Sequence, residues 1–168
     1  MKLADAGDAS AISLLAQATF AETFEHLYDP KDLQTFLEAK HSVGFYEAVM
    51  ARPDCQIWGL KSGDKLFGYC MVTDNSLPCD PPRPDALELS RLYLSSEMRG
   101  QGWGSRLIDK VIEYARGKGY PEIVLSVFSE NHGGIRLYTR HGFQKIGEYD
   151  FPVGDHLDRE WIMCRPVD

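Results

Sequence analysis

Apolar side chains recur at helical spacing through roughly the first 50 residues of the chain. Three predicted helices begin there, each at a residue whose side chain can cap the first turn: Asp8, Asp29 and Ser42. Pro30 follows Asp29 at the first helical position, where a missing N–H is tolerated, and the third helix must end before Pro53. The chain is therefore expected to open with three helices.

From residue 56 the apolar pattern alternates instead, which is typical of strands. Residues 56–72 are predicted to form two strands around a turn at 62–64, and residues 86–94 to form a third. Residues 75–84 hold four prolines and are predicted to be a surface loop between two strands. The middle of the chain is therefore expected to be a sheet with one long connection.

Helices and strands alternate through the rest of the chain. The predicted elements are, in order, a helix over 102–117, a buried strand over 122–128, a helix from Asn131 to near Gly142, and strands over 144–149 and 160–164. This order predicts one mixed sheet with helices on its faces, an α/β architecture that some schemes class as α+β. Because a single sheet fits 168 residues, we expect one domain over residues 1–168.

Charge and composition narrow the classes of function. Hydrophobic residues make up 43% and charged residues 26%, and the formal net charge of −7 comes without a run rich in lysine and arginine. A nucleic-acid-binding surface needs a basic footprint, so no nucleic-acid partner is expected. An acidic surface concentrates amines around it, which is compatible with a cationic small-molecule substrate and equally with plain solubility.

Neither a membrane segment nor a metal site is expected. No apolar run approaches the ~20 residues of a membrane helix, and the N-terminus lacks the apolar core of a signal peptide. We therefore expect a cytoplasmic protein. The cysteines form neither a CxxC pair nor a Cys/His cluster with zinc spacing: Cys55, Cys70, Cys79 and Cys164. No disulfide framework and no metal are expected.

A glycine-rich turn joins the third predicted strand to the helix that follows it. Gly100, Gly102 and Gly104 would let an anion approach the backbone, the free N–H groups of the helix start would bind it, and Arg99 adds positive charge. The spacing is neither GxxxxGK[ST] nor GxGxxG. The run predicts a phosphate cradle, and a tight strand-to-helix turn would explain the same glycines.

A second group of residues lies at the start of the helix that begins at Asn131. Tyr138 follows seven residues later, which is two helical turns, so both side chains share one face. Gly134 lies between them on that face and has no side chain. A thin ligand could lie there between the amide and the hydroxyl.

Together these motifs resemble the GCN5-related N-acetyltransferase (GNAT) superfamily. The family signature Q/R-x-x-G-x-G/A is similar to the segment that runs from Arg99 to Gly104, and its later N-x-x-A/G-x-x-x-Y…G-F element is similar to Asn131, Gly134, Tyr138 and Gly142-Phe143. The matching block spans roughly residues 86–164, nearly half of the chain. Residues 18–28 also resemble a bacterial branch that acetylates spermidine and spermine.

The resemblance implies the fold and the cosubstrate. The fold would be a mixed, mostly antiparallel sheet of about six to seven strands with about four to five helices. The cosubstrate would be acetyl-CoA, its pyrophosphate held by Arg99, Gly100, Gln101, Gly102, Trp103, Gly104 and Ser105. The ring of Trp103 is expected in the core. The pantetheine arm would pair with Leu92, Tyr93 and Leu94 on a bulged, splayed strand, and Asn131, Gly134 and Tyr138 would face the cofactor.

The resemblance also implies the reaction and its catalytic groups. The acetyl group would move to a primary amine of a small molecule or polyamine by direct attack in a ternary complex. A free alkyl amine has a pKa of ~10 and must lose a proton to react. Glu88 is the candidate base, directly or through water, and an ordinary salt-bridged strand residue is the alternative. Tyr138 would protonate the leaving thiolate, unless it only packs its ring.

The acceptor is expected to meet Phe24, Glu25 and Tyr28, because aromatic faces and a carboxylate suit an ammonium group. Other readings remain open: an acyl-CoA-binding module without transfer, an acetyltransferase of proteins or peptides, and a phosphate-binding domain for another nucleotide. The sequence leaves open the identity of the amine, the physiological role, whether the protein is a homodimer, and whether a water chain replaces Glu88.

Overall fold

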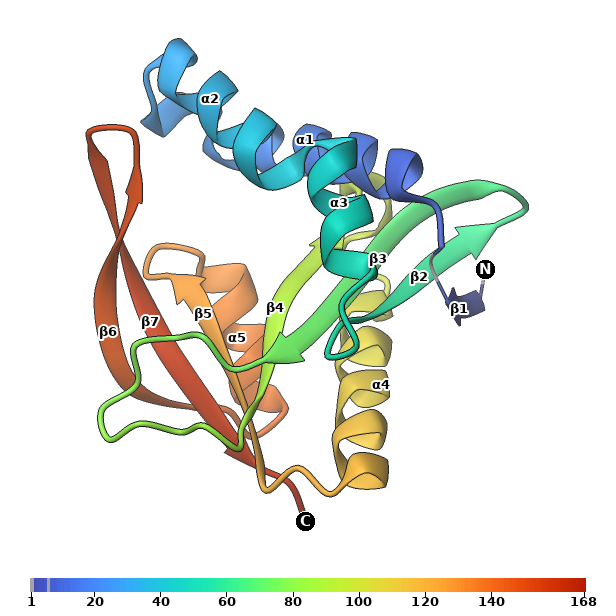
Figure 1. The fold of residues 1–168 in the computed structure, drawn as a ribbon, viewed down its shortest axis with the longest axis vertical. Helices are drawn as coiled ribbons and strands as arrows, with labels where there is room; N and C mark the ends of the chain where they lie inside the picture. The colour runs from blue at the N-terminus through green and yellow to red at the C-terminus, as the bar shows by residue number, and fades with distance from the viewer. Residues whose placement is uncertain (1, 6) are drawn as a thin grey trace.

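A seven-stranded sheet runs through the computed structural model, which describes residues 2–5 and 7–168 (Figure 1). The strand order is β1-β2-β3-β4-β5-β7-β6, with β4 and β5 parallel and the other neighbours antiparallel. The strands are β1 (Lys2–Asp5), β2 (Gln56–Ser62), β3 (Lys65–Asp74), β4 (Leu87–Leu94), β5 (Glu122–Phe128), β6 (Gln144–Val153) and β7 (His156–Pro166). The mixed, mostly antiparallel sheet expected from the sequence is confirmed.

Helices cover both faces of this sheet. They are α1 (Ala9–Phe24), α2 (Pro30–His41), α3 (Val43–Met50), α4 (Trp103–Lys118) and α5 (His132–Arg140), with short 3-10 turns η1 (Glu25–Leu27) and η2 (Ser96–Met98). The predicted caps are confirmed, because backbone N–H groups of the first turn donate to the side chains of Asp8, Asp29 and Ser42. The Asn131 side chain also caps the helix that was predicted to start there. Among the described helices, none combines the length and apolar character needed to cross a bilayer.

The core is divided between the two faces. On one face α1 and α3 pack Ile12 and Tyr46 against Tyr69 and Met71 of β3. On the other face, α4 contributes a buried stripe: Leu107, Ile108, Val111, Ile112 and Ala115. Alternate residues of one strand point to opposite faces, so the same strands contribute to both clusters. The four cysteines are free, and Cys70 and Cys164 are buried, as expected of small apolar side chains.

The parallel strands β4 and β5 open a gap in the sheet. They pair at Leu87–Ile123 and Glu88–Val124 and then diverge, as Figure 1 shows. The register of β4 against β3 shifts near Ser90, which marks a bulge. The bulged, splayed strand implied by the family resemblance is therefore present, and it exposes one edge of the β4 backbone.

Two strand predictions differ from the structure. The edge strand β1 is absent from the predicted order, since four residues carry too short a pattern to identify. The last two strands are longer than the predicted 144–149 and 160–164, and they meet at a turn where Gly154 has a φ of +60°. Pro152 and Gly154 make this segment resemble a loop, but β6 is an edge strand, and a proline is tolerated there.

The tip of the β6–β7 hairpin reaches the first two helices. Val153 is buried against Phe20 and Tyr28, and the Asp155 N–H lies 3.5 Å from Asp32 Oδ2 of α2. Phe36 of α2 packs edge-on against Phe151 of β6. These contacts join segments more than 100 residues apart and form a wall at one end of the gap in the sheet.

Candidate active site

A cavity of about 1220 Å³ extends along the gap between β4 and β5. Its lining includes the turn before α4, the splayed halves of both strands, the first turns of α5, and aromatic residues of α1 and α2. This volume exceeds the ≈ 300–1,000 Å³ of ordinary small-molecule pockets. The cavity therefore has room for a long ligand together with a second, smaller one.

The glycine-rich turn before α4 forms one part of the cavity wall. Gly100 and Gly102 have φ angles of +74° and +80°, which only glycine adopts easily, and a Cβ on either would meet open space. Gly102 is the N-cap of α4 and has no side chain of its own to satisfy the first N–H groups. Arg99, which also lines the cavity, lies 3.4 Å from Glu22 in a half-exposed ion pair. The turn thus presents free N–H donors and a positive charge to an anion.

The predicted cradle residues do not all face the cavity. Arg99, Gly100, Gly102, Gly104 and Ser105 line it. Gln101 does not, because its amide donates to the Glu97 carbonyl at 2.7 Å and lies at the surface. Trp103 also lies outside the lining, partly exposed, with the Arg106 guanidinium 4.4 Å above its ring. The expectation of a core ring at Trp103 is therefore wrong.

Asn131, the N-cap of α5, and Tyr138 within that helix line the same cavity as Gly134, which lies between them. The Asn131 side-chain oxygen accepts the Gly134 N–H at 2.9 Å, so the cap leaves the NH₂ group for other partners. A Cβ on Gly134 would lie 2.9 Å from the Asn131 amide nitrogen. Glycine is thus required there to let the Asn131 side chain fold over the helix start, in addition to any close ligand.

Tyr138 keeps its proton and has a free hydroxyl. Burial raises its pKa above the ordinary value, and the nearby negative charge of Glu160 raises it further. The ring packs edge-on against Phe143, 5.9 Å between centroids. The hydrogen bonds within the described residues leave the Tyr138 hydroxyl unused, and the residue lines the cavity beside Leu94 and Asn131. It is therefore available as a proton donor.

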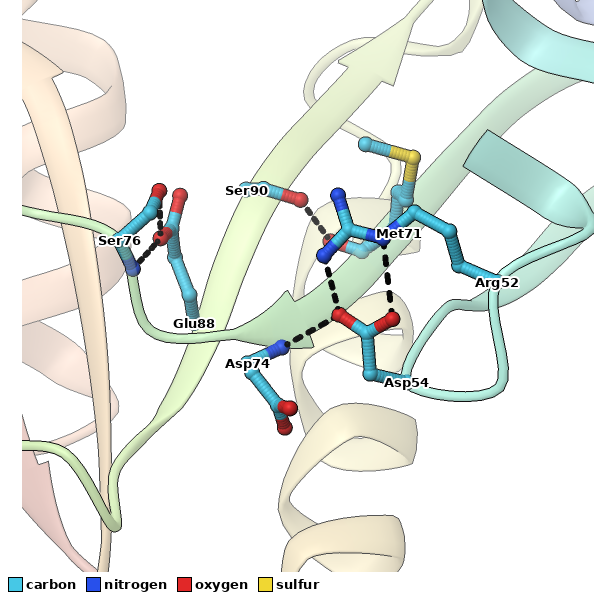
Figure 2. A network of polar contacts seen from close by, with 7 residues as sticks. All are labelled: Arg52, Asp54, Met71, Asp74, Ser76, Glu88 and Ser90. Atoms are coloured by element: carbon cyan, nitrogen blue, oxygen red, sulfur yellow. Dashed lines mark hydrogen bonds and ion pairs between the residues drawn. The ribbon is translucent and has the colours of Figure 1, made fainter. Parts of the chain in front are cut away.

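Glu88 faces the cavity at the point where β4 and β5 separate. Its side chain is 7% exposed, and Oε2 accepts hydrogen bonds from Ser76 N–H at 2.8 Å and from the Ser76 hydroxyl at 2.9 Å. Figure 2 shows the two residues facing each other, with Ser90 on the following stretch of β4. The ion pairs of the described residues do not include Glu88, so the alternative of an ordinary salt bridge is wrong.

The predicted acceptor residues are only partly brought together. Phe24 and Tyr28 line the cavity, whereas Glu25 is exposed and lies outside its lining. Phe24 packs edge-on against Phe128 of β5, 5.9 Å between centroids. Other aromatic residues complete this end: Phe20, Phe36, Tyr93, Tyr149 and Phe151. This end of the cavity is thus an aromatic chamber, to which α1 and α2 contribute side chains.

The sequence did not identify two carboxylates on β7. Asp158 is 4% exposed and accepts a hydrogen bond from Tyr28, and Glu160 lies partly buried in the same lining. A strand predicted over 156–166 would have placed both on one face, because they are two residues apart. Within residues 2–5 and 7–168, acidic, histidine and cysteine side chains do not gather into a group of three that could hold a metal ion.

Comparison with known proteins identifies the family. The family model described as "Acetyltransferase (GNAT) family" matches residues 16–143, which is most of the chain. The chain belongs to the GNAT acetyltransferase family. An uncharacterized N-acetyltransferase of Lactobacillus delbrueckii subsp. lactis is 24% identical over 153 residues, 91% of this chain and 88% of that protein. N-acetyltransferase 8 of Rattus norvegicus is 40% identical over 93 residues, 54% of this chain and 40% of that protein.

Solved GNAT structures share the fold. The PaiA N-acetyltransferase from Thermoplasma acidophilum, solved with coenzyme A, has a TM-score of 0.75 at 20% identity, with 99% of each chain covered. The ribosomal-protein-S18-alanine N-acetyltransferase from Escherichia coli has a TM-score of 0.67 at 16% identity, covering 99% of this chain and 94% of that one. At these identities the likeness concerns the fold and not the acceptor.

Proposed function

We propose that this GNAT protein transfers the acetyl group of acetyl-CoA to a primary amine of a small molecule or polyamine, by direct attack in a ternary complex. The observation that carries the proposal is a single cavity. It joins the glycine turn of α4 and the open edge of β4 to an aromatic chamber that holds carboxylates. A long cosubstrate and a small acceptor can therefore meet within it.

The residues around the gap fit acetyl-CoA. Gly100 and Gly102 have open space above them where a Cβ would otherwise intrude, and Arg99 supplies positive charge for the pyrophosphate. The backbone from Leu92 to Leu94 lies at the splayed edge, where the amides of the pantetheine arm would pair with it in the manner of a strand. When bound, acetyl-CoA supplies an activated acetyl group on a thiol leaving group.

The side chains divide the proton transfers between them. Glu88 faces the acceptor and, as a carboxylate held by Ser76, accepts the proton that the amine must lose, directly or through water. Tyr138 donates a hydrogen bond or a proton to the departing sulfur: its raised pKa keeps the hydroxyl protonated, and the hydrogen bonds among the described residues leave that hydrogen unused. Backbone N–H groups at the end of β4 are placed to stabilise negative charge on the carbonyl oxygen.

The walls of the aromatic chamber support a small acceptor. The β6–β7 hairpin packs Val153 onto Phe20 and Tyr28, and its turn contacts Asp32 of α2. A polypeptide acceptor extends beyond its reacting amino group, so the rest of its chain would have to leave the cavity past such walls. A small amine needs no such path.

A panel of amines tests the proposal. Purified protein is mixed with acetyl-CoA and n-butylamine, 2-phenylethylamine, spermidine or a lysine-containing peptide, and free CoA and product mass are measured. Release of CoA that depends on a small amine supports the proposal. Release of CoA with the peptide alone would contradict the small acceptor and indicate a peptide acetyltransferase. Tight binding of acetyl-CoA without transfer would identify an acyl-CoA-binding module. A site for another nucleotide would show no competition between 3′-phospho-ADP and CoA.

A further inference from the structure

Glu160 lies in a row of side chains that crosses three strands on the cavity face of the sheet. In the register, Glu160 of β7 is directly opposite Phe128 of β5 and Tyr149 of β6. Directly opposed residues of antiparallel strands point to the same face. All three side chains line the cavity, and Glu160 is partly buried there. Its carboxylate is therefore directed into the aromatic chamber.

The protein provides Glu160 with weak polar partners. The Tyr149 hydroxyl is 3.4 Å from Glu160 Oε2 and 3.3 Å from the Ser126 hydroxyl, both longer than a typical O–H···O bond. Glu88 differs, because two donors of Ser76 lie within 2.9 Å of one of its oxygens. Of the two carboxylates, Glu160 has more capacity left for an external donor.

Glu160 also lacks a cation. The ion pairs within the described residues use other carboxylates and do not include Glu160. A buried carboxylate without a cation is costly, and burial accordingly raises the pKa of Glu160. The Ser126 and Tyr149 hydroxyls offset part of this rise, and the neighbouring charge of Asp158 adds to it. An ammonium group brought in by a ligand would relieve that cost.

The position of Glu160 is central to the site. Burial is the main cause of the raised pKa of each of four cavity tyrosines, and the charge of Glu160 raises each one further: Tyr28, Tyr93, Tyr138 and Tyr149. Glu160 also lines the same cavity as the candidate acid Tyr138, the end of β4 and the aromatic side chains of the chamber. An amine bound to it would lie at the junction between the acceptor end and the acetyl-CoA end.

We propose that Glu160 binds the ammonium group of the acceptor and so selects cationic amines. This rests on the proposed function for the identity of the ligand as an acceptor. Aromatic residues around the carboxylate, Phe24 and Phe128 among them, add favourable faces for a cation. Glu160 is a binding residue in this arrangement, and Glu88 remains the candidate base.

Binding of cations tests the proposal without turnover. The probes are protonated 2-phenylethylamine and n-butylamine, with 2-phenylethanol as the neutral comparator, titrated by calorimetry into protein saturated with CoA, which carries no acetyl group to transfer. Wild type is expected to bind at least one cation more tightly than the alcohol. Glu160→Gln is expected to weaken that binding at least tenfold and to leave the acetyl-CoA affinity unchanged.

Three further variants separate charge from structure. Glu148→Gln removes the same charge from an exposed position of β6 outside the cavity, and is expected to bind the cations as wild type does. Glu160→Asp keeps the charge and is expected to restore most of the affinity. Glu88→Gln is expected to lower kcat and leave cation binding intact, whereas Glu160→Gln should act mainly on the KM of the amine.

The outcomes keep the two proposals distinct. Equal cation binding by wild type and Glu160→Gln overturns the role of Glu160, as does a wild type that binds neither cation or prefers the alcohol. If cation binding depends on Glu160 but no amine of the panel is acetylated, the binding site stands and the proposed function fails. If amines are acetylated and the KM of the amine is unchanged in Glu160→Gln, the proposed function stands and the role of Glu160 fails.

Discussion

Within residues 2–5 and 7–168, the Tyr138 hydroxyl has no hydrogen-bond partner, and burial raises its pKa above the ordinary value. Tyr138→Phe keeps the ring on Phe143 and removes the hydroxyl. If the hydroxyl protonates the leaving sulfur, kcat should fall on the order of 10²-fold, and less if a thiolate of pKa ~8.5 leaves well unaided. Acetyl-CoA affinity and stability should change little. Single-turnover kinetics measure the effect where chemistry limits the rate.

The control for Tyr138 is Tyr114→Phe, which removes a tyrosine hydroxyl from α4 outside the cavity lining. It should leave kcat unchanged. An unchanged kcat in Tyr138→Phe as well would remove this residue from the mechanism and leave it as a packing residue on the cofactor face.

His41 is a buried histidine that should make stability depend on pH. It is 1% exposed, its Nδ1 lies 3.0 Å from the Tyr46 hydroxyl, and that hydroxyl lies 2.6 Å from the Tyr69 hydroxyl. Burial, with the charge of Arg91, lowers the pKa of His41 to about 3. The unfolded chain, with a histidine pKa of ~6.5, therefore binds more protons between these values, and stability must fall as the pH drops below ~6.5.

Because of His41, the free energy of unfolding should fall by about 2 kcal/mol between pH 8 and pH 5. The interval from the unfolded pKa of ~6.5 down to pH 5 is ~1.5 pH units, at 1.36 kcal/mol each. His41→Asn keeps an amide group near the Tyr46 hydroxyl and cannot titrate. Urea unfolding of both proteins at the two pH values measures the difference. If both proteins lose the same stability, His41 is not the group responsible.

The two ends of α4 allow the anion cradle to be tested at the scale of an element. Gly102 caps the start with a φ of +80°, Gly119 caps the end with a φ of +78°, and an added Cβ meets open space at both. Alanine at either should cost about 1–2 kcal/mol from the left-handed backbone alone. Only Gly102 lies where a phosphate would approach.

Gly102→Ala should therefore weaken acetyl-CoA binding more than tenfold, or about 1.4 kcal/mol, beyond the strain that it shares with Gly119→Ala. Calorimetric titration with acetyl-CoA, alongside urea unfolding of both variants, measures the two effects separately. Equal acetyl-CoA affinities for the two variants would contradict the cradle and leave the glycines as turn residues.

Local signals explain which elements the sequence could predict. The side chains of Asp8, Asp29 and Ser42 cap helix starts within three residues, so these predicted caps were correct. The helix start predicted at Asn131 was correct for the same reason. The pairing of β1 and the length of the β6–β7 hairpin depend on distant partners, and no short window carries that information.

In the candidate site, too, the sequence predicts the features that short motifs encode and misses those that depend on distant strand pairing. The glycine turn and the start of α5 are contiguous motifs, and both line the cavity. Glu25 seemed suited to an ammonium because of its place between aromatic residues, yet it faces outward on η1, whereas Glu160 reaches the cavity through the register of β7. Which carboxylate faces the cavity is decided by strand pairing, which a single sequence does not display.

At the scale of the whole molecule, the two core clusters share their strands. Ile57 and Met71 face α1 and α3, while their neighbours Trp58 and Cys70 face α4. Loss of either layer would expose one face of β2 and β3, so neither layer is independent of the other. We therefore predict one cooperative unfolding transition, as for a single domain over residues 1–168.

Bound acetyl-CoA should raise the Tm of this single transition without splitting it. At 100 times its Kd, a ligand that binds the native state adds about 2.7 kcal/mol, which for a protein of this size is a rise in Tm of roughly 5–11 °C. Differential scanning calorimetry with and without acetyl-CoA measures it. Gly119→Ala should show the full shift, while Gly102→Ala should lose about half of it or more at the same concentration. Two transitions, of which only one moves, would contradict the shared core, because α1–α3 and the hairpin would then unfold separately from the sheet that binds the cosubstrate.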